Sequence, residues 1–320
     1  MKKPDRLKNM LGILKDKVLI LKASLVISSK PTKFFNVAVL RATTYHNPSD
    51  PPPIDAVLAL AHNHRPSTGV IIHALLRRLH GTHNVYVALK CLLTLHHLLS
   101  NSKPALKDQI MSHSNGPIFN MSNFRDESDR DTWELSDWVR WYADVLDYSF
   151  SRKRGERLNW LVGMVEIICK SPDSLYYQKL GLIYEVMKLV GEDYRMIMRE
   201  INNNINQFGN NKRIIEDLND DLLKDLLGDL KRLKNSREKL FLMFLNKKND
   251  GIWGLIDQVE KDVEYVKEKR KNMRLVMFQG TESTRVVDNR VSESTQLAVV
   301  PVLPRGRKWL DVEWNRLVVV

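Results

Sequence analysis

The sequence predicts an all-α protein, an array of about ten stacked helices rather than a symmetric four-helix bundle. Apolar residues recur three or four positions apart along most of the chain, as they do on the buried face of a helix. Turn signals separate these segments at short intervals, and residues 1–280 contain no alternating strands with hairpin turns. With 320 residues, 43% of them hydrophobic, the chain can bury a substantial core.

The first predicted helix spans residues 7–26 and is amphipathic. Lysines occupy the faces beside its apolar stripe, which consists of Leu7, Leu11, Leu14, Val18, Leu21 and Leu25. A basic amphipathic helix can lie flat on an anionic membrane. The same stripe can equally pack against the domain that follows, and the sequence leaves both interpretations open.

One helix is expected at the centre of the core. Asn84 is the predicted N-cap of Val85–Ser100, in which almost every position is apolar. A long polar connection follows over residues 101–131. The other predicted helices are Asp55–His62, Thr68–His80, Trp133–Phe150, Arg157–Lys170, Ser174–Val190, Glu192–Phe208, a helix marked by Ile215 to Leu233, and one from Leu255 to Met277.

Three regions follow from the composition. Residues 1–35 form a basic amphipathic arm, residues 36–280 form the helical domain, and residues 281–320 form a short tail. The tail begins with a stretch rich in Ser, Thr and charge, which is typical of disorder. Its last 24 residues carry valines and the tryptophans Trp309 and Trp314, and they can serve as a docking peptide or fold against the domain.

Positive charge is concentrated in the arm. The chain has a net charge of +12, and residues 1–35 contribute +7 of it, from nine basic residues against Asp5 and Asp16. Clustered cations attract an anionic membrane or a nucleic acid. No RNA- or DNA-reading motif accompanies them, so we expect no specific nucleic-acid partner. A solvated helix face without a ligand is the simpler alternative.

The sequence carries no pattern for catalysis or for a metal site. A P-loop, a Rossmann glycine pattern, a zinc-ligand cysteine pair and an HExxH motif are all missing, so we expect no enzyme activity and no cofactor. His96 and His97 are adjacent on the most apolar helix and point in different directions, so they cannot chelate one metal together. Cys91 and Cys169 lie in apolar runs, as reduced core residues of a cytosolic protein do.

Four motifs resemble one family. Val37–Thr44 reads VAVLRATT, Val87–Leu99 reads VALKCLLTLHHLL, Phe124–Ser128 reads FRDES ahead of Val139–Tyr142, and Cys169 is followed by a proline at position 172. In this order they resemble the ANTH domains of the ENTH/ANTH superfamily, and in particular those of plant clathrin assembly proteins. The resemblance covers roughly residues 10–280. It implies a right-handed α-solenoid of about ten helices.

The resemblance also implies a lipid site at the N-terminal end of the solenoid. ANTH domains hold the phosphates of phosphatidylinositol 4,5-bisphosphate with exposed cations from two places, and Arg41 matches the first. The second, a run of lysines, falls on Pro51–Asp55, which carries no cation. We expect other cations to compensate, namely Lys30, Lys33 and His46 beside Arg41, and Lys2, Lys3 and Lys8 in the arm.

The implied role is that of a phosphoinositide-binding peripheral adaptor in clathrin coat assembly, endocytosis and vesicle budding. Its implied partners are clathrin, adaptor proteins and SNAREs, and its implied locations are the cytoplasm, coated pits, coated vesicles and the Golgi. The alternative is a protein-interaction scaffold of the same fold with weakened lipid recognition, whose surface would lie over residues 215–277. The two Asp-Leu-Leu triplets at 221–223 and 225–227 are expected to pack rather than to bind coat proteins.

Overall fold

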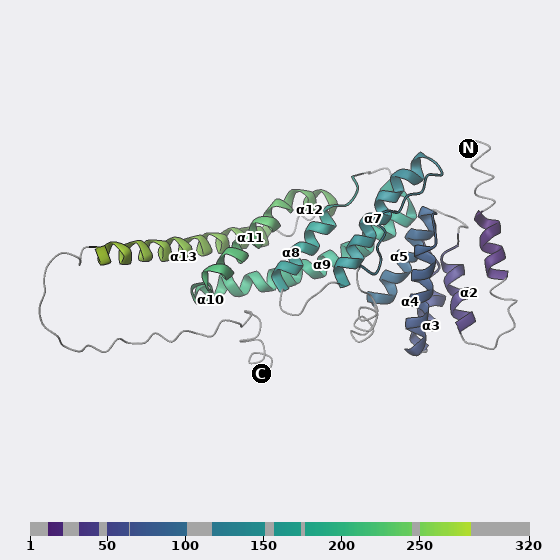
Figure 1. Cartoon of the computed structure of the whole chain (residues 1–320), viewed down its shortest axis with the longest axis horizontal. Helices are drawn as coiled ribbons and strands as arrows, with labels where there is room; N and C mark the ends of the chain where they lie inside the picture. Colours follow the sequence, from purple (N-terminus) through teal and green to yellow (C-terminus); the bar gives the residue numbers. More distant parts are fainter. Residues whose placement is uncertain are drawn as a thin grey trace, which may run out of the picture. The chain divides into compact units, whose positions relative to one another are not determined.

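A computed structural model gives the fold of the chain (Figure 1). It describes residues 12–21, 32–44, 50–63, 65–100, 117–150, 157–173, 177–244 and 250–282. Within these ranges the regular structure is helical and no strand occurs. The predicted all-α class is therefore confirmed.

The helices fall into two compact units. The first unit comprises residues 1–151 and 167–196, and the second comprises residues 152–166 and 197–320. The predicted boundaries of the arm, the domain and the tail stay a prediction.

The first unit is built around one helix, α5. A helix over residues 12–21 comes first, followed by α2 (Thr32–Ala42), α3 (Asp55–Asn63), α4 (Arg65–His80), α5 (Val85–Ser100) and α7 (Arg130–Phe150). Helix α5 packs against α3, α4 and α7, and α2 packs against α3 and α4. Every residue of α5 from Val87 to His96 is buried. The predicted central position of this helix is therefore confirmed.

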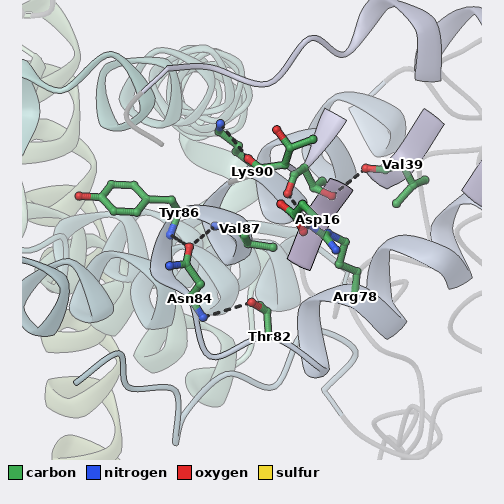
Figure 2. Close-up of polar contacts among 10 residues, drawn as sticks. Asp16, Val39, Arg78, Thr82, Asn84, Tyr86, Val87 and Lys90 are labelled. Atoms are coloured by element: carbon green, nitrogen blue, oxygen red, sulfur yellow. Dashed lines mark hydrogen bonds and ion pairs between the residues drawn. The ribbon is translucent and has the colours of Figure 1, made fainter. Parts of the chain in front are cut away.

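The start of α5 is fixed by side-chain acceptors. Asn84 Oδ1 accepts hydrogen bonds from the backbone N–H groups of Tyr86 and Val87, both at 3.1 Å, as predicted for an N-cap (Figure 2). The first N–H of the helix, that of Val85, instead donates to Asp126 Oδ2 at 2.9 Å. Asp126 is itself buried, and its other carboxylate oxygen accepts from Ser128 N. The connection before α7 therefore caps α5 from a distance.

A buried histidine joins three helices of the first unit. His96 Nδ1 lies 2.8 Å from Tyr142 Oη on α7, and His96 Nε2 lies 3.0 Å from Asp193 Oδ2 on α9. Buried polar groups need such partners, because an unpaired one costs desolvation energy. This explains why the most apolar helix carries a histidine, and its role is structural.

Several helix boundaries differ from the prediction. Helix α4 begins at Arg65, because Pro66 sits in its first turn, where a missing N–H costs nothing. One helix, α9 (Gly181–Asn210), covers most of the two predicted over residues 174–208, and a short 3-10 helix (Tyr177–Lys179) precedes it. Its apolar stripe continues past Gly191, and this packing outweighs the intrinsic penalty of about 1 kcal/mol for glycine.

The predicted helix over residues 215–233 is in fact two helices. They are α10 (Lys212–Asp217) and α11 (Asp220–Asn235). The chain breaks at Asn219, whose side chain accepts the N–H of Leu222 at 2.8 Å and so starts a new helix. Helix α12 (Arg237–Phe244) follows and was not predicted.

The second unit packs α11 and α10 against the long helix α13 (Asp250–Glu282). The predicted helix from Leu255 is thus confirmed but is longer. Ion pairs show that α11 and α13 run antiparallel: Lys234 lies 2.7 Å from Glu260, whereas Asp220 lies 2.6 Å from Arg274. Helix α8 (Arg157–Cys169) begins in this unit.

The capping role of Asp126 predicts a loss of stability on its removal. Asp126→Ala leaves the buried N–H of Val85 without its acceptor, so we expect the free energy of unfolding to fall by about 1–3 kcal/mol. Urea unfolding followed by circular dichroism measures this change. The neighbouring Glu127→Ala is the matched control, because Glu127 is exposed. Equal stability of the two variants would contradict the capping role.

Candidate functional site

The candidate site lies at the C-terminal end of α2, around Arg41. The inward positions of this helix are buried, at Phe35, Val39 and Ala42, whereas the Arg41 side chain in the last turn is exposed. Phe34 lies seven residues before Arg41, which places both on one helix face, and it is 73% exposed. This face therefore offers a cation and an aromatic ring to a ligand.

Of the predicted site residues, Arg41 is the one whose side chain the structure describes. Lys33 belongs to α2, but its side chain lies outside the described atoms. The other predicted cations lie outside the described residues, namely Lys2, Lys3, Lys8, Lys30 and His46. Their contribution to the site stays a prediction.

The residues that follow Arg41 stabilise the turn after α2, residues 41–44, which we call the corner. Ala42 and Thr43 are buried, and Thr43 Oγ1 donates to Val39 O at 2.7 Å, one turn back in α2 (Figure 2). Different residues of the VAVLRATT motif therefore have different roles. Its Ala-Thr pair packs inside, and its arginine faces solvent.

Arg78 of α4 ties the corner to the first helix. Its Nη2 atom donates to Thr43 O at 2.8 Å and to Asp16 Oδ1 at 2.9 Å (Figure 2). Both side chains of the ion pair are largely buried, with 13% and 12% exposed. A cation at the C-terminal end of a helix also offsets the negative end of the helix dipole. One guanidinium therefore joins α2, α4 and the helix over residues 12–21.

A buried lysine supports the same corner from α5. Lys90 Nζ donates to Thr44 O at 3.2 Å, and the residue is 3% exposed. Burial lowers the pKa of the Lys90 ammonium to about 8, while the charges of Asp50 and Asp16 act in the opposite direction. The negative charge of Asp50 thus compensates a buried cation.

The segment without cations, residues 50–55, has structural roles instead. Pro52 is buried, and Asp55 opens α3, where an acidic side chain favours the positive end of the helix dipole. Asp50 faces solvent and acts on Lys90 as described above. None of these six residues carries a positive charge.

The helix over residues 12–21 exposes its apolar stripe. Leu14, Val18 and Leu21 are 61%, 43% and 56% exposed, whereas Asp16 is buried against Arg78. These three residues therefore do not pack against the first unit, and the packing interpretation is wrong for them. Lys15 and Lys17 are exposed beside them. The helix is anchored by its one acidic residue and keeps basic and apolar side chains outside.

Other kinds of site find little support in the part of the chain that the structure describes. There, no three His, Cys, Asp or Glu side chains gather as metal ligands would. None of the described helices combines the length and the apolar character that crossing a bilayer requires.

Sequence reasoning missed four members of this site. Phe34, Asp16, Arg78 and Lys90 were not singled out, and among them Lys90 alone has a weak signal in the sequence. A charged residue in an otherwise apolar helix, such as Lys90, indicates a buried polar contact. The Asp16–Arg78 pair joins residues 62 positions apart, so only the fold reveals it.

Known proteins resemble the chain over most of its length. A family model described as ANTH domain matches residues 35–166. A relative from Arabidopsis thaliana named "Putative clathrin assembly protein" is 32% identical over 294 residues, which cover 79% of this chain and 80% of the relative. A second Arabidopsis relative with that description is 26% identical, covering 87% of this chain and 91% of its own length. A third is 38% identical over 42% of this chain and 20% of the relative.

The buried Lys90 predicts a specific dependence of stability on pH. Its pKa is about 8 in the folded protein against 10.5 as the ordinary value, so between these values the folded state binds fewer protons than the unfolded state. Stability therefore rises as the pH rises from about 8 to about 10.5, by up to about 3 kcal/mol.

Urea unfolding of the native protein and of Lys90→Met at several pH values checks this expectation. The variant keeps the length of the side chain but has no ammonium to titrate, so the difference in stability between the two proteins should change across this window. A difference in stability that stays constant between pH 7.5 and 10.5 would show that burial does not lower the pKa of Lys90.

Proposed function

The chain belongs to the ANTH-domain family, and from this premise we propose that it is a phosphoinositide-binding peripheral membrane adaptor in clathrin coat assembly. The observation that carries the proposal is the exposed Arg41 on the buried, hydrogen-bonded corner of α2. A cation held on a rigid support loses little entropy when it contacts a phosphate.

The local electrostatics support phosphate binding at this corner. The carbonyl groups of Thr43 and Thr44, which directly follow α2, would repel an anion, but Thr43 O accepts a hydrogen bond from Arg78 and Thr44 O accepts one from Lys90. Arg41 therefore faces a ligand beside neutralised acceptors. We propose that Arg41 contacts a phosphate of phosphatidylinositol 4,5-bisphosphate, assisted by Lys30, Lys33, His46 and the arm cations Lys2, Lys3 and Lys8.

The helix over residues 12–21 supports contact with a membrane surface. Its exposed Leu14, Val18 and Leu21 lie beside the exposed Lys15 and Lys17. Apolar side chains favour the acyl boundary of a bilayer, and lysines favour anionic headgroups by about 1 kcal/mol each. The helix is thus suited to lie on the same lipid surface that Arg41 contacts.

The proposed partners follow from the names of the relatives, which assign them to clathrin assembly. We propose that the chain works with clathrin, adaptor proteins and SNAREs at coated pits and vesicles and at the Golgi, on the cytoplasmic side. Its role is to bind and to recruit rather than to catalyse.

A second function is favoured by the missing cations at residues 50–55. A family member without the usual lysine run can act as a helical scaffold for proteins, with weak direct lipid recognition. The two functions differ in whether Arg41 controls binding to membranes.

Liposome co-sedimentation with and without phosphatidylinositol 4,5-bisphosphate tests the proposal. Loss of one membrane-proximal cation costs about 1 kcal/mol, so we expect Arg41→Ala to weaken binding to the lipid-containing liposomes about fivefold. Arg195→Ala is the matched control, because Arg195 is an exposed arginine on α9, and it should bind as the native protein does.

Three outcomes are distinguishable. Weaker binding of Arg41→Ala alone supports the specific site. Equal weakening by both substitutions would show that the protein binds the liposomes through its overall positive charge and not through a specific contact of Arg41. Liposome binding that is the same with and without phosphatidylinositol 4,5-bisphosphate, and that neither substitution changes, would favour the scaffold function.

A further inference from the structure

The second unit contains a groove lined by apolar side chains and by two aspartates. Its cavity has a volume of about 280 Å³. Leu158, Phe208, Leu222 and Leu226 line the apolar part, from helices α8, α9 and α11. Asp225 and Asp229, one turn apart on α11, also line the groove.

The two aspartates give the groove negative charge. Asp229 is buried, and its Oδ1 accepts hydrogen bonds from Asn159 at 3.1 Å and from Arg232 at 3.0 Å. Arg232 pairs with two carboxylates at once, because its Nε and Nη2 atoms also donate to the two carboxylate oxygens of Glu166. Burial raises the pKa of the Asp229 carboxyl to about 6, although Arg232 and Asn159 act in the opposite direction. Asp225, which is exposed, adds a second negative charge.

We propose that this groove binds the chain's own C-terminal segment, residues 303–314. The segment reads LPRGRKWLDVEW and places Arg305, Arg307 and Lys308 directly before Trp309 and Leu310. Three cations beside two large apolar residues complement a groove that has acidic groups beside leucines. The cations meet Asp225 and Asp229, and the apolar pair fills the part lined by Leu222 and Phe208.

The length of the chain allows this contact. Helix α13 runs antiparallel to α11, and Arg274 near its end pairs with Asp220 at the start of α11. The helix ends at Glu282, and the 20 residues from 283 to 302 then lead to the proposed segment. Twenty residues span up to about 66 Å when extended, far more than two turns of α11 from Asp220 to Leu226.

Occupancy of the groove by the tail would control access to this face of the second unit. A partner that binds α11 would have to displace the segment, so the tail acts as an internal competitor. This regulation is independent of the lipid contact at Arg41, and either can fail without the other.

Hydrogen exchange of the full-length protein tests the proposal. In Arg305→Glu/Arg307→Glu, we expect amides of residues 218–229 to exchange about tenfold faster than in the native chain, because the covering segment is lost. Arg316→Glu is the control for tail charge outside the segment and should leave these rates unchanged. Adding Asp225→Lys to Arg305→Glu/Arg307→Glu should restore much of the protection, since the charges are then exchanged across the contact.

Carbodiimide coupling gives a second measurement on the full chain. It joins a carboxylate to an amine in direct contact, so we expect a link between Asp225 and Lys308 that is lost in Asp225→Asn and in Lys308→Arg. A link whose yield is independent of protein concentration supports binding within one chain. A yield that rises with concentration would identify a second copy as the occupant and overturn the proposal, as would unchanged exchange rates in all variants.

Discussion

The contact between Arg78 and two acceptors organises the N-terminal part of the molecule. One nitrogen, Nη2, holds the carboxylate of Asp16 and the carbonyl of Thr43 at the same time. The first acceptor anchors the helix over residues 12–21, and the second ends α2. Because the pair is largely buried, removal of either charge would leave the other without compensation. Arg41, two residues before Thr43, faces solvent.

The sequence predicted what local chemistry determines. Asn84 begins α5 as expected, and the nearly uninterrupted apolar run of this helix does place it at the centre of the first unit. The break at Asn219 was missed because the leucine stripe of α10 and α11 keeps its spacing across it. The continuity of α9 through Gly191 was missed for the opposite reason, since packing overrode a local breaker.

The candidate site was predictable in part. Arg41 came from the VAVLRATT motif, and its exposure agrees with a ligand-binding role. The motif does not show that Ala42 and Thr43 are interior residues, or that Lys90 supports Thr44 from another helix. Such contacts join residues far apart in the chain, so hydrophobic periodicity carries no signal for them. Asp50, directly before the stretch without cations, illustrates this best, because its charge counteracts the lowering of the pKa of the buried Lys90.

The central claim is that Arg41 is the remaining part of a two-part phosphate site. Restoring cations at the second part, with Pro53→Lys and Asp55→Lys, tests it most directly by liposome affinity for phosphatidylinositol 4,5-bisphosphate. Two membrane-proximal cations should raise the affinity about thirtyfold, and the same two substitutions should give a smaller gain when Arg41→Ala is present. An equal gain with and without Arg41 would contradict the account, because the two positions would then not share one headgroup.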